Sequence, residues 1–207
     1  MPHAEQGAAL LIGRDERITL ASRSPRRAQL LAMLGVSFDV IAGADENGRR
    51  RSEESPADYV IRLAREKALA VARQVPCGIV LGADTIVHLD GQILEKPRDA
   101  QEAADFLRRL SGREHEVYTG ICLAPAGGGA PRCAVERSAV RFVDLDEATI
   151  HRYVATGEPL DKAGAYGIQG FGGMLVAEIR GCYFNVMGLP LARLRALFAE
   201  LGAPTSG

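Results

Sequence analysis

The chain has 207 residues, of which 47% are hydrophobic and 25% charged, and its formal net charge is −1 at pH 7. This composition is typical of a globular protein with one core or two apposed lobes, and it excludes the disordered, fibrous and membrane classes. The near-zero charge argues against bulk nucleic-acid binding, which usually needs a basic face, but it leaves room for a concentrated basic pocket.

The two ends and the cysteines add little chemistry. Residues 1–15 are predicted to be a loose extension, and residues 16–203 a single domain. The apolar run at 8–12 is too short to cross a membrane. The four cysteines show neither a CxxC pair nor a histidine at zinc-site spacing, so each is expected to be a reduced, apolar side chain of a cytoplasmic protein: Cys77, Cys122, Cys133 and Cys182.

Hydrophobic periodicity predicts alternating strands and helices along the chain. Strands are expected at 18–21, 38–42, 78–83, 116–123, 133–143, 175–179 and 183–186, and helices at 24–34, 57–73, 99–110, 144–155 and 190–201. A hairpin over 85–94 should turn at Asp90-Gly91. Capping boxes at Asp99 and Asp144 would open two of the helices. The pattern predicts an α/β fold with a mixed twisted sheet and helices on both faces.

The segment LASRSPRR at 20–27 places Ser24 at the N-cap of a helix and Pro25 in its first turn. Free backbone N–H groups and the helix dipole favour an anion at that position. Arg26 and Arg27 also lie in this first turn, where cations are misplaced unless an anion binds. The segment therefore points to a phosphate site, with a solvated turn or a nucleic-acid contact as alternatives.

The segment GADT at 82–85 places Asp84 at the expected carboxyl end of a hydrophobic strand. Catalytic and metal-binding acids commonly occupy such positions in open α/β sheets, although the residue could simply cap a turn. The predicted hairpin would return Lys96 to the same region, where it could form an ordinary ion pair.

The loop at 157–173 contains six glycines among seventeen residues, with Lys162 and Gln169 between them. Its interleaved Tyr, Ile and Phe residues favour a loop that holds a ligand over a merely flexible one. A weaker candidate is Asp45-Glu46, which could supply a second carboxylate for a metal. Lys67 lies on a helix, where a surface pair at i,i+4 is the simplest interpretation.

Taken together and in order, several segments resemble the Maf family of nucleotide pyrophosphatases over about residues 18–201. They are SRSPRR, Asp45-Glu46, REKA, GADT, EKPRD, HEVYTG, DKAGAYGIQG and NVMGLP. Only three of the 25 basic residues are lysines, and all three fall within these segments. An arginine-rich loop at 48–52 departs from the family pattern without touching its motifs.

The resemblance implies a two-lobed fold, related to that of inosine-triphosphate pyrophosphatases, with the nucleotide in a cleft between the lobes. It implies hydrolysis of dTTP and UTP to the monophosphate and pyrophosphate, with Mg²⁺ or Mn²⁺ as cofactor. It also implies a cytoplasmic location and a link to septum formation, and a homodimer is expected because members of the family are often dimeric. No nucleic-acid or membrane partner is expected, from the near-zero charge and the shortness of the apolar run. By position, the implied residues are a general base at Asp84; specificity residues at Arg26, Thr85 and Gln169; phosphate ligands at Ser24, Arg27, Lys67, Lys96 and Lys162; and metal ligands at Glu46 and Asp84.

Two alternatives stay open. One is a pyrophosphatase for 7-methyl-GTP or another purine triphosphate, against which Gln169 argues. The other is a non-catalytic nucleotide-binding regulator of division, against which the retained acids Asp84 and Glu46 argue.

Overall fold

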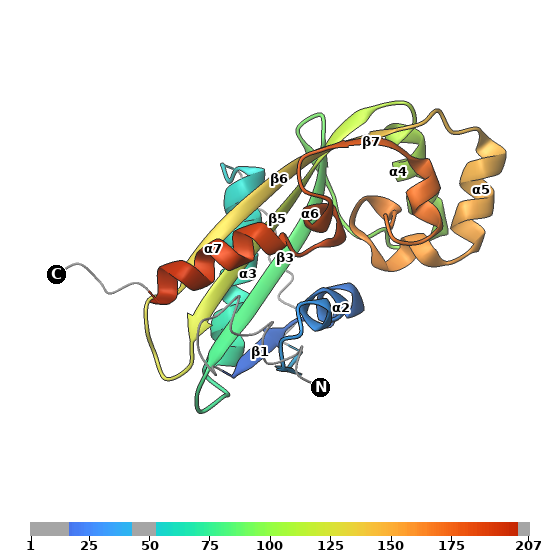
Figure 1. The fold of residues 1–207 in the computed structure, drawn as a ribbon. Coiled ribbons are helices and arrows are strands. Elements are labelled where there is room, and N and C mark those ends of the chain that lie inside the picture. The colour runs from blue at the N-terminus through green and yellow to red at the C-terminus, as the bar shows by residue number, and fades with distance from the viewer. Residues whose placement is uncertain (1–16, 43–52, 203–207) are drawn as a thin grey trace. The chain divides into compact units, whose positions relative to one another are not determined.

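The computed structural model describes residues 17–42 and 53–202 (Figure 1). Its strands are β1 (Ile18–Ala21), β2 (Phe38–Val40), β3 (Ile79–Leu89), β4 (Gln92–Leu94), β5 (Glu114–Pro125), β6 (Arg132–Phe142) and β7 (Val176–Arg180). Its α-helices are α2 (Pro25–Met33), α3 (Pro56–Ala72), α4 (Ala100–Leu110), α5 (Glu147–Ala155), α6 (Tyr183–Met187) and α7 (Leu191–Gly202). No helix in these two ranges is long and apolar enough to cross a membrane.

The strands form one mixed sheet in the order β2-β1-β3-β5-β6-β7, with β4 paired to β3. Strand β1 is parallel to both β2 and β3, while β3 with β4 and β6 with β7 are antiparallel. The predicted mixed α/β sheet is therefore confirmed. The expected extension at 1–15 and the pair Asp45-Glu46 lie outside the described residues.

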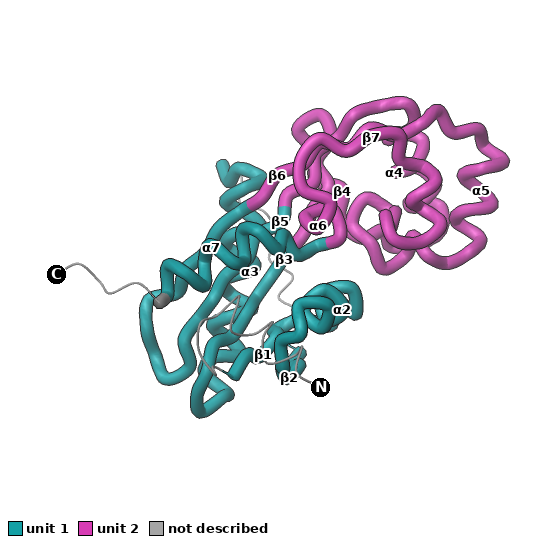
Figure 2. The backbone as a smooth tube through the Cα atoms, viewed as in Figure 1, with its two compact units in different colours: residues 1–84, 119–135, 188–207 teal, residues 85–118, 136–187 magenta. Residues whose placement is uncertain are grey.

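The chain divides into two compact units (Figure 2). Unit 1 comprises residues 1–84, 119–135 and 188–207, and unit 2 comprises residues 85–118 and 136–187. Strands β3, β5 and β6 each contribute residues to both units.

In unit 1, the layer between α3 and the sheet is made of small side chains. The buried residues that share it are Ala21, Ala64, Ala68, Val71, Ala72, Val80, Cys122 and Ala124. Figure 1 shows α3 passing behind the strands of this unit and α7 in front of them. Because the α3 layer contains little but alanine, valine and cysteine, helix and sheet can approach closely, and this approach positions the polar groups described below.

Two of the cysteines depart from the expectation of reduced thiols. Cys122 of β5 and Cys133 of β6 form a disulfide, with their Cα atoms 4.0 Å apart. Their separation of 11 residues spans the turn between two neighbouring strands, which brings them side by side. Cys77 and Cys182 are free, as predicted.

In unit 2, a separate core packs α4 and α5 against those parts of β3, β5 and β6 that belong to this unit. Its largest buried side chains include Leu94, Leu107, Leu110, Phe142 and Ile150. Tyr166 and Leu175 from the 157–175 segment also belong to this core. That segment is built of three short 3₁₀ turns, η1 (Glu158–Asp161), η2 (Ala163–Ala165) and η3 (Phe171–Leu175), so it is an ordered part of the unit.

Three local predictions were wrong. First, 78–83 is not a separate strand, because β3 continues through Asp84 to Leu89 before the confirmed turn at Asp90-Gly91. Second, helix α5 is capped by Asp146, whose side chain accepts from the Thr149 N–H, and not by Asp144. Third, the predicted strand at 183–186 is the short helix α6.

Candidate active site

Asp84 and Lys67 form a half-buried ion pair in unit 1. Nζ of Lys67 donates to Oδ1 of Asp84 at 2.5 Å, and the two side chains are 23% and 15% exposed. The simple surface interpretation of Lys67 is therefore wrong, since its partner lies 17 residues away in β3. A half-buried pair is screened less by solvent than a surface pair, so this one holds the carboxylate in a defined orientation.

The position of this pair follows from glycines in the sheet. A Cβ added at Gly82 would lie 2.2 Å from the Ala64 carbonyl oxygen, and one at Gly120 would lie 2.3 Å from the Val60 carbonyl oxygen. Helix α3 therefore rests directly on the backbone of β3 and β5. Residues two apart share a face of a strand, so Asp84 points to the α3 side like Gly82 and meets Lys67 there.

Arg27 is a buried cation in the same unit. Its side chain is 9% exposed; Nε donates to the Gly188 carbonyl at 2.8 Å and Nη1 to the Ser22 hydroxyl at 3.1 Å. Burial lowers the pKa of Arg27, the charge of Asp84 raises it in part, and Arg26 lowers it further. A guanidinium stays protonated in proteins, so this position keeps its positive charge.

The start of α2 has the geometry predicted for it. Ser24 is the N-cap residue, Pro25 begins the helix, and the first turn carries no acidic side chain. The Ser24 side chain makes no capping hydrogen bond. Arg26 is half-buried. The first turn thus places two arginines at a helix N-terminus, where the helix dipole favours an anion, and carries no carboxylate of its own.

In unit 2, the predicted hairpin positions Thr85 and Lys96. The register pairs Val87 with Leu94, so both residues lie just beyond the paired part of β3 and β4. The side chain of Thr85 is half-buried and that of Lys96 is exposed. Lys96 is therefore accessible to an anion in solvent.

The glycine loop, residues 157–173, carries the other two candidates of this unit. Nζ of Lys162 donates to Oδ1 of Asp161 at 2.6 Å and to the Glu158 carbonyl at 2.7 Å. The side chain of Gln169 is exposed. Lys162 is therefore held in place within the loop, while Gln169 is presented to solvent.

His115 connects β5 to the same loop. Its Nε2 lies 2.9 Å from the Tyr166 hydroxyl, and its ring packs edge-on against Phe142 and Tyr166. His115 is only 2% exposed, and its Nδ1 has no hydrogen-bond partner among the described residues. Burial lowers the pKa of His115 to about 4, so the ring is neutral at physiological pH.

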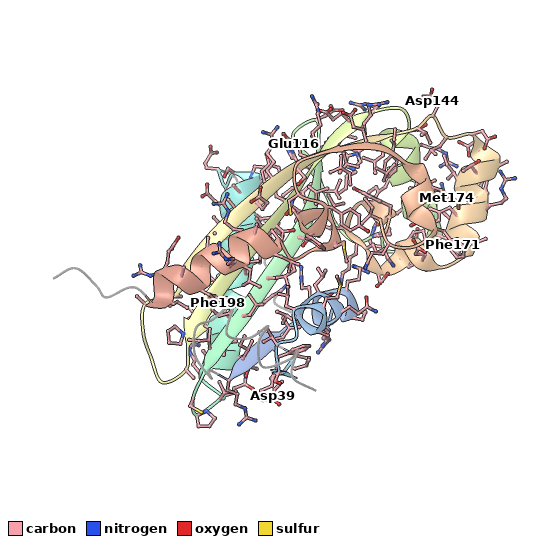
Figure 3. All side chains as sticks on the ribbon, in the orientation of Figure 1. Asp39, Glu116, Asp144, Phe171, Met174 and Phe198 are labelled. Carbon is pink, nitrogen blue, oxygen red and sulfur yellow. A yellow bond between two sulfur atoms is a disulfide. The ribbon has the colours of Figure 1, made fainter. Side chains whose placement is uncertain are left out.

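A second polar cluster of unit 2 surrounds Glu116, which Figure 3 labels. Its carboxylate lies 3.0 Å from Nδ1 of His88, accepts from the Tyr118 hydroxyl at 3.0 Å and pairs with Arg137. Burial works to raise the pKa of Glu116, but these three partners lower it below its ordinary value. Since all of its partners are side chains of the sheet, this cluster ties β3, β5 and β6 together.

Two residues were missed from the sequence. Glu158 and Tyr153 hydrogen-bond to each other at 2.9 Å, and both bond the backbone of the glycine loop. The sequence could have indicated Glu158, because a carboxylate at the start of a glycine-rich segment can accept hydrogen bonds from the backbone N–H groups of that segment.

The predicted metal ligand Glu46 lies outside the described residues. Within residues 17–42 and 53–202, no group of three or more His, Cys, Asp or Glu side chains could hold a metal ion.

Comparison with known proteins adds family evidence to this geometry. The family model described as Maf-like protein matches residues 17–201. A dTTP/UTP pyrophosphatase of Syntrophus aciditrophicus is 49% identical over 92% of this chain and 92% of its own length. A dTTP/UTP pyrophosphatase of Anaeromyxobacter dehalogenans is 52% identical over 91% of this chain and 95% of its own.

Among solved structures, a nucleoside-triphosphatase, dITP/XTP pyrophosphatase, of Mycobacterium abscessus matches with a TM-score of 0.43 and 17% identity, covering 90% of this chain and 100% of that one. The family model and the two relatives all extend over the segments that contain Ser24, Lys67, Asp84 and Gln169. The chain belongs to the Maf family.

Proposed function

We infer that this chain is a nucleoside-triphosphate pyrophosphatase that hydrolyses dTTP and UTP to the monophosphate and pyrophosphate. The observation that carries the inference is its close similarity, over nearly its whole length, to relatives named dTTP/UTP pyrophosphatases. The half-buried Lys67–Asp84 pair supports it, because it supplies a fixed carboxylate beside a cation. The cellular role that corresponds to this activity is the removal of such triphosphates from the nucleotide pool.

In the proposed reaction, Asp84 orients a water molecule toward the α-phosphorus and accepts its proton. The water oxygen forms a bond to this phosphorus, the bond to the bridging oxygen breaks, and pyrophosphate leaves. Lys67 holds the Asp84 carboxylate by its bond to Oδ1. Phosphoryl transfer demands mainly such positioning together with neutralisation of the developing charge.

The phosphates would be held by Ser24, Arg27, Lys67, Lys96 and Lys162, as the resemblance implies. The first turn of α2 supports this assignment for Ser24 and Arg27, since a helix N-terminus favours an anion and no acidic side chain of the turn competes with one. Lys162 would exchange its present carboxylate partner, Asp161, for a phosphate oxygen.

Pyrimidine preference is assigned to Gln169, with Thr85 and Arg26. The side-chain amide of Gln169 can donate to O4 and accept from N3–H of uracil or thymine. A glutamate at this position would be an acceptor only and would suit the guanine edge instead. The exposure of Gln169 leaves its amide available to a base.

Asp84 is also proposed as a ligand of a divalent cation, Mg²⁺ or Mn²⁺, together with Glu46. Its carboxylate is a hard oxygen donor of the kind that Mg²⁺ prefers, and Mg²⁺ often takes its other ligands from water and substrate phosphates. Ligands from water and substrate would be needed here, since the described residues contain no group of three or more His, Cys, Asp or Glu side chains that could hold a metal ion. When bound, the cation would neutralise phosphate charge.

Cytoplasmic location, a homodimer and a link to septum formation stay predictions from the resemblance.

A panel of triphosphates tests the function. The purified chain is incubated with UTP, dTTP, GTP or 7-methyl-GTP, with MgCl₂, MnCl₂ or EDTA, and the products are separated by ion-pair chromatography. We expect equimolar UMP and pyrophosphate from UTP, with UTP and dTTP preferred. Preference for 7-methyl-GTP would place the chain in a purine branch, and tight UTP binding without turnover would indicate a non-catalytic protein.

A further inference from the structure

The glycine loop is built around one carboxylate. Oε2 of Glu158 accepts from the Phe171 N–H at 2.9 Å, and Oε1 accepts from the Gly172 N–H at 3.1 Å. Burial works to raise the pKa of Glu158, but these two N–H groups lower it below its ordinary value. An ionised carboxylate makes stronger hydrogen bonds than a neutral acceptor, so this contact fixes the loop backbone at two consecutive residues, where η3 begins.

Tyr153 of α5 completes the contact. Its hydroxyl donates to Oε1 of Glu158 at 2.9 Å and accepts from the Gly167 N–H at 3.1 Å. Tyr153 is only 5% exposed, so its position is set by the core of unit 2. The segment 167–172 is therefore tied at its start, through Gly167, and at its end, through Phe171 and Gly172. We call Glu158 and Tyr153 the loop brace.

Two glycines of the loop are explained by this brace. A Cβ added at Gly170 would lie 2.2 Å from Oε2 of Glu158, and one at Gly172 would lie 2.5 Å from the Tyr153 hydroxyl. The sequence suggested that these glycines let a ligand approach the backbone. In the structure, they let the backbone approach the loop brace.

Gln169 lies between the two tied ends, and its side chain is exposed. Phe171 of the loop and Met174 directly after it, both labelled in Figure 3, are 59% and 74% exposed. Because no described side chain buries Gln169, its direction depends on the backbone of 167–172. The backbone of that segment is in turn held by the loop brace.

We propose that Glu158 and Tyr153 position Gln169 for base recognition through the backbone of residues 167–172, and so set the pyrimidine preference of the enzyme without touching the substrate. This proposal rests on the proposed function. Glu158 is then a positioning residue, and its loss should change which triphosphate is preferred, beyond any effect on folding.

The test compares variants of the brace by kcat/KM for UTP and GTP. Glu158→Ala should lower kcat/KM for UTP by about a hundredfold, a loss that a misplacement of about 1 Å can cause. Its UTP-to-GTP ratio should fall by about tenfold, within the range by which pocket contacts discriminate substrates. Tyr153→Phe should lower the UTP value by about tenfold, the equivalent of one net hydrogen bond.

Glu158→Gln provides a graded variant. Its amide oxygen can still accept from the Gly172 N–H and the Tyr153 hydroxyl, but its NH₂ group would face the Phe171 N–H, two donors together. We expect values between those of wild type and Glu158→Ala. Amide hydrogen exchange of 167–172 is measured in each free protein, and faster exchange should be confined to this segment.

Asp146→Ala is the matched control. Asp146 caps α5, the helix that carries Tyr153, through a 2.7 Å bond to the Thr149 N–H, and has no part in the brace. Its removal should weaken the helix while leaving the UTP-to-GTP ratio unchanged. An equal loss of preference in Asp146→Ala would overturn the proposal, because general destabilisation would then explain it.

The proposal is also overturned if Glu158→Ala exchanges its loop amides faster yet keeps the wild-type preference. Should Glu158→Ala fail to fold, Tyr153→Phe and Glu158→Gln carry the same test. Failure of the proposed function looks different, since wild type itself would then release no pyrophosphate, while an unchanged ratio in an active variant removes only the positioning role.

Discussion

At the scale of single residues, the sequence indicated which side chains could take part in chemistry more readily than which residues they contact. The sequence singled out Asp84 and Lys67, yet it placed Asp84 at a strand end and Lys67 on a surface. The structure instead pairs them from β3 and α3. The same holds for Cys122 and Cys133, whose disulfide depends on two strands lying side by side. Residue types indicate what a group can do, but a partner far along the chain is fixed only by the fold.

Asp84→Asn should remove most of the turnover while leaving the protein folded. The amide keeps the size of the side chain but cannot accept a proton, and a loss of about a hundredfold or more in kcat is expected for a general base. Steady-state kinetics with UTP, beside circular dichroism of both proteins, provide the measurement. A folded Asp84→Asn protein that turns over at the wild-type rate would refute the assignment.

His115 should make stability depend on pH. Its pKa is about 4 in the folded protein against 6.5 for the ordinary group. Between these values, the unfolded chain binds a proton that the folded protein does not. The contribution of His115 to the free energy of unfolding therefore falls as pH drops from 6.5 toward 4, and it is constant above that window. The full change is about 3 kcal/mol at most.

The measurement is urea unfolding at several pH values for wild type and His115→Gln. The difference between the two curves isolates this group from other titrating side chains. We expect the wild type to lose more stability than the variant between pH 6.5 and 4. Parallel curves would mean that His115 is not buried in its neutral form.

At the scale of elements, periodicity predicted the long helices and strands well, and tertiary contacts decided the exceptions. Helix α5 begins after Asp146 because the Ser111 hydroxyl, which accepts from the Leu145 N–H at 2.7 Å, holds residue 145 outside the helix. Segment 183–187 is helical, and its Asn185 side chain is buried and donates to the Val117 carbonyl at 3.0 Å. Such contacts are invisible to a local pattern.

Gly82→Ala should separate α3 from β3. The added Cβ would meet the Ala64 carbonyl oxygen at 2.2 Å, and overpacking of this kind costs about 1–3 kcal/mol. Because α3 carries Lys67, we also expect reduced turnover of UTP. Gly129→Ala is the control, since the atoms nearest to its Cβ would be those of the Pro125 ring, at 3.1 Å and beyond, and it should change stability by about 0.5 kcal/mol or less. Equal unfolding midpoints for the two variants would contradict the close approach of α3.

At the scale of the whole molecule, the ordered set of motifs indicated a Maf-like chain over residues 18–201, and the family model matches residues 17–201. The sheet class was predictable because periods of two and 3.6 residues alternate along the chain. The strand order was not, since β1 lies between β2 and β3 through pairings that no local pattern specifies. The candidate residues divide between the two units, with Lys67 and Asp84 in unit 1 and Lys162 and Gln169 in unit 2.

Hydrolysis of UTP in ¹⁸O-labelled water shows which phosphorus the water attacks. The products of a single-turnover reaction are separated and analysed by mass spectrometry. We expect one ¹⁸O atom in UMP and none in pyrophosphate, since the water oxygen joins the α-phosphorus and the bridging oxygen leaves with pyrophosphate. Label in pyrophosphate, or formation of UDP and phosphate, would contradict this expectation.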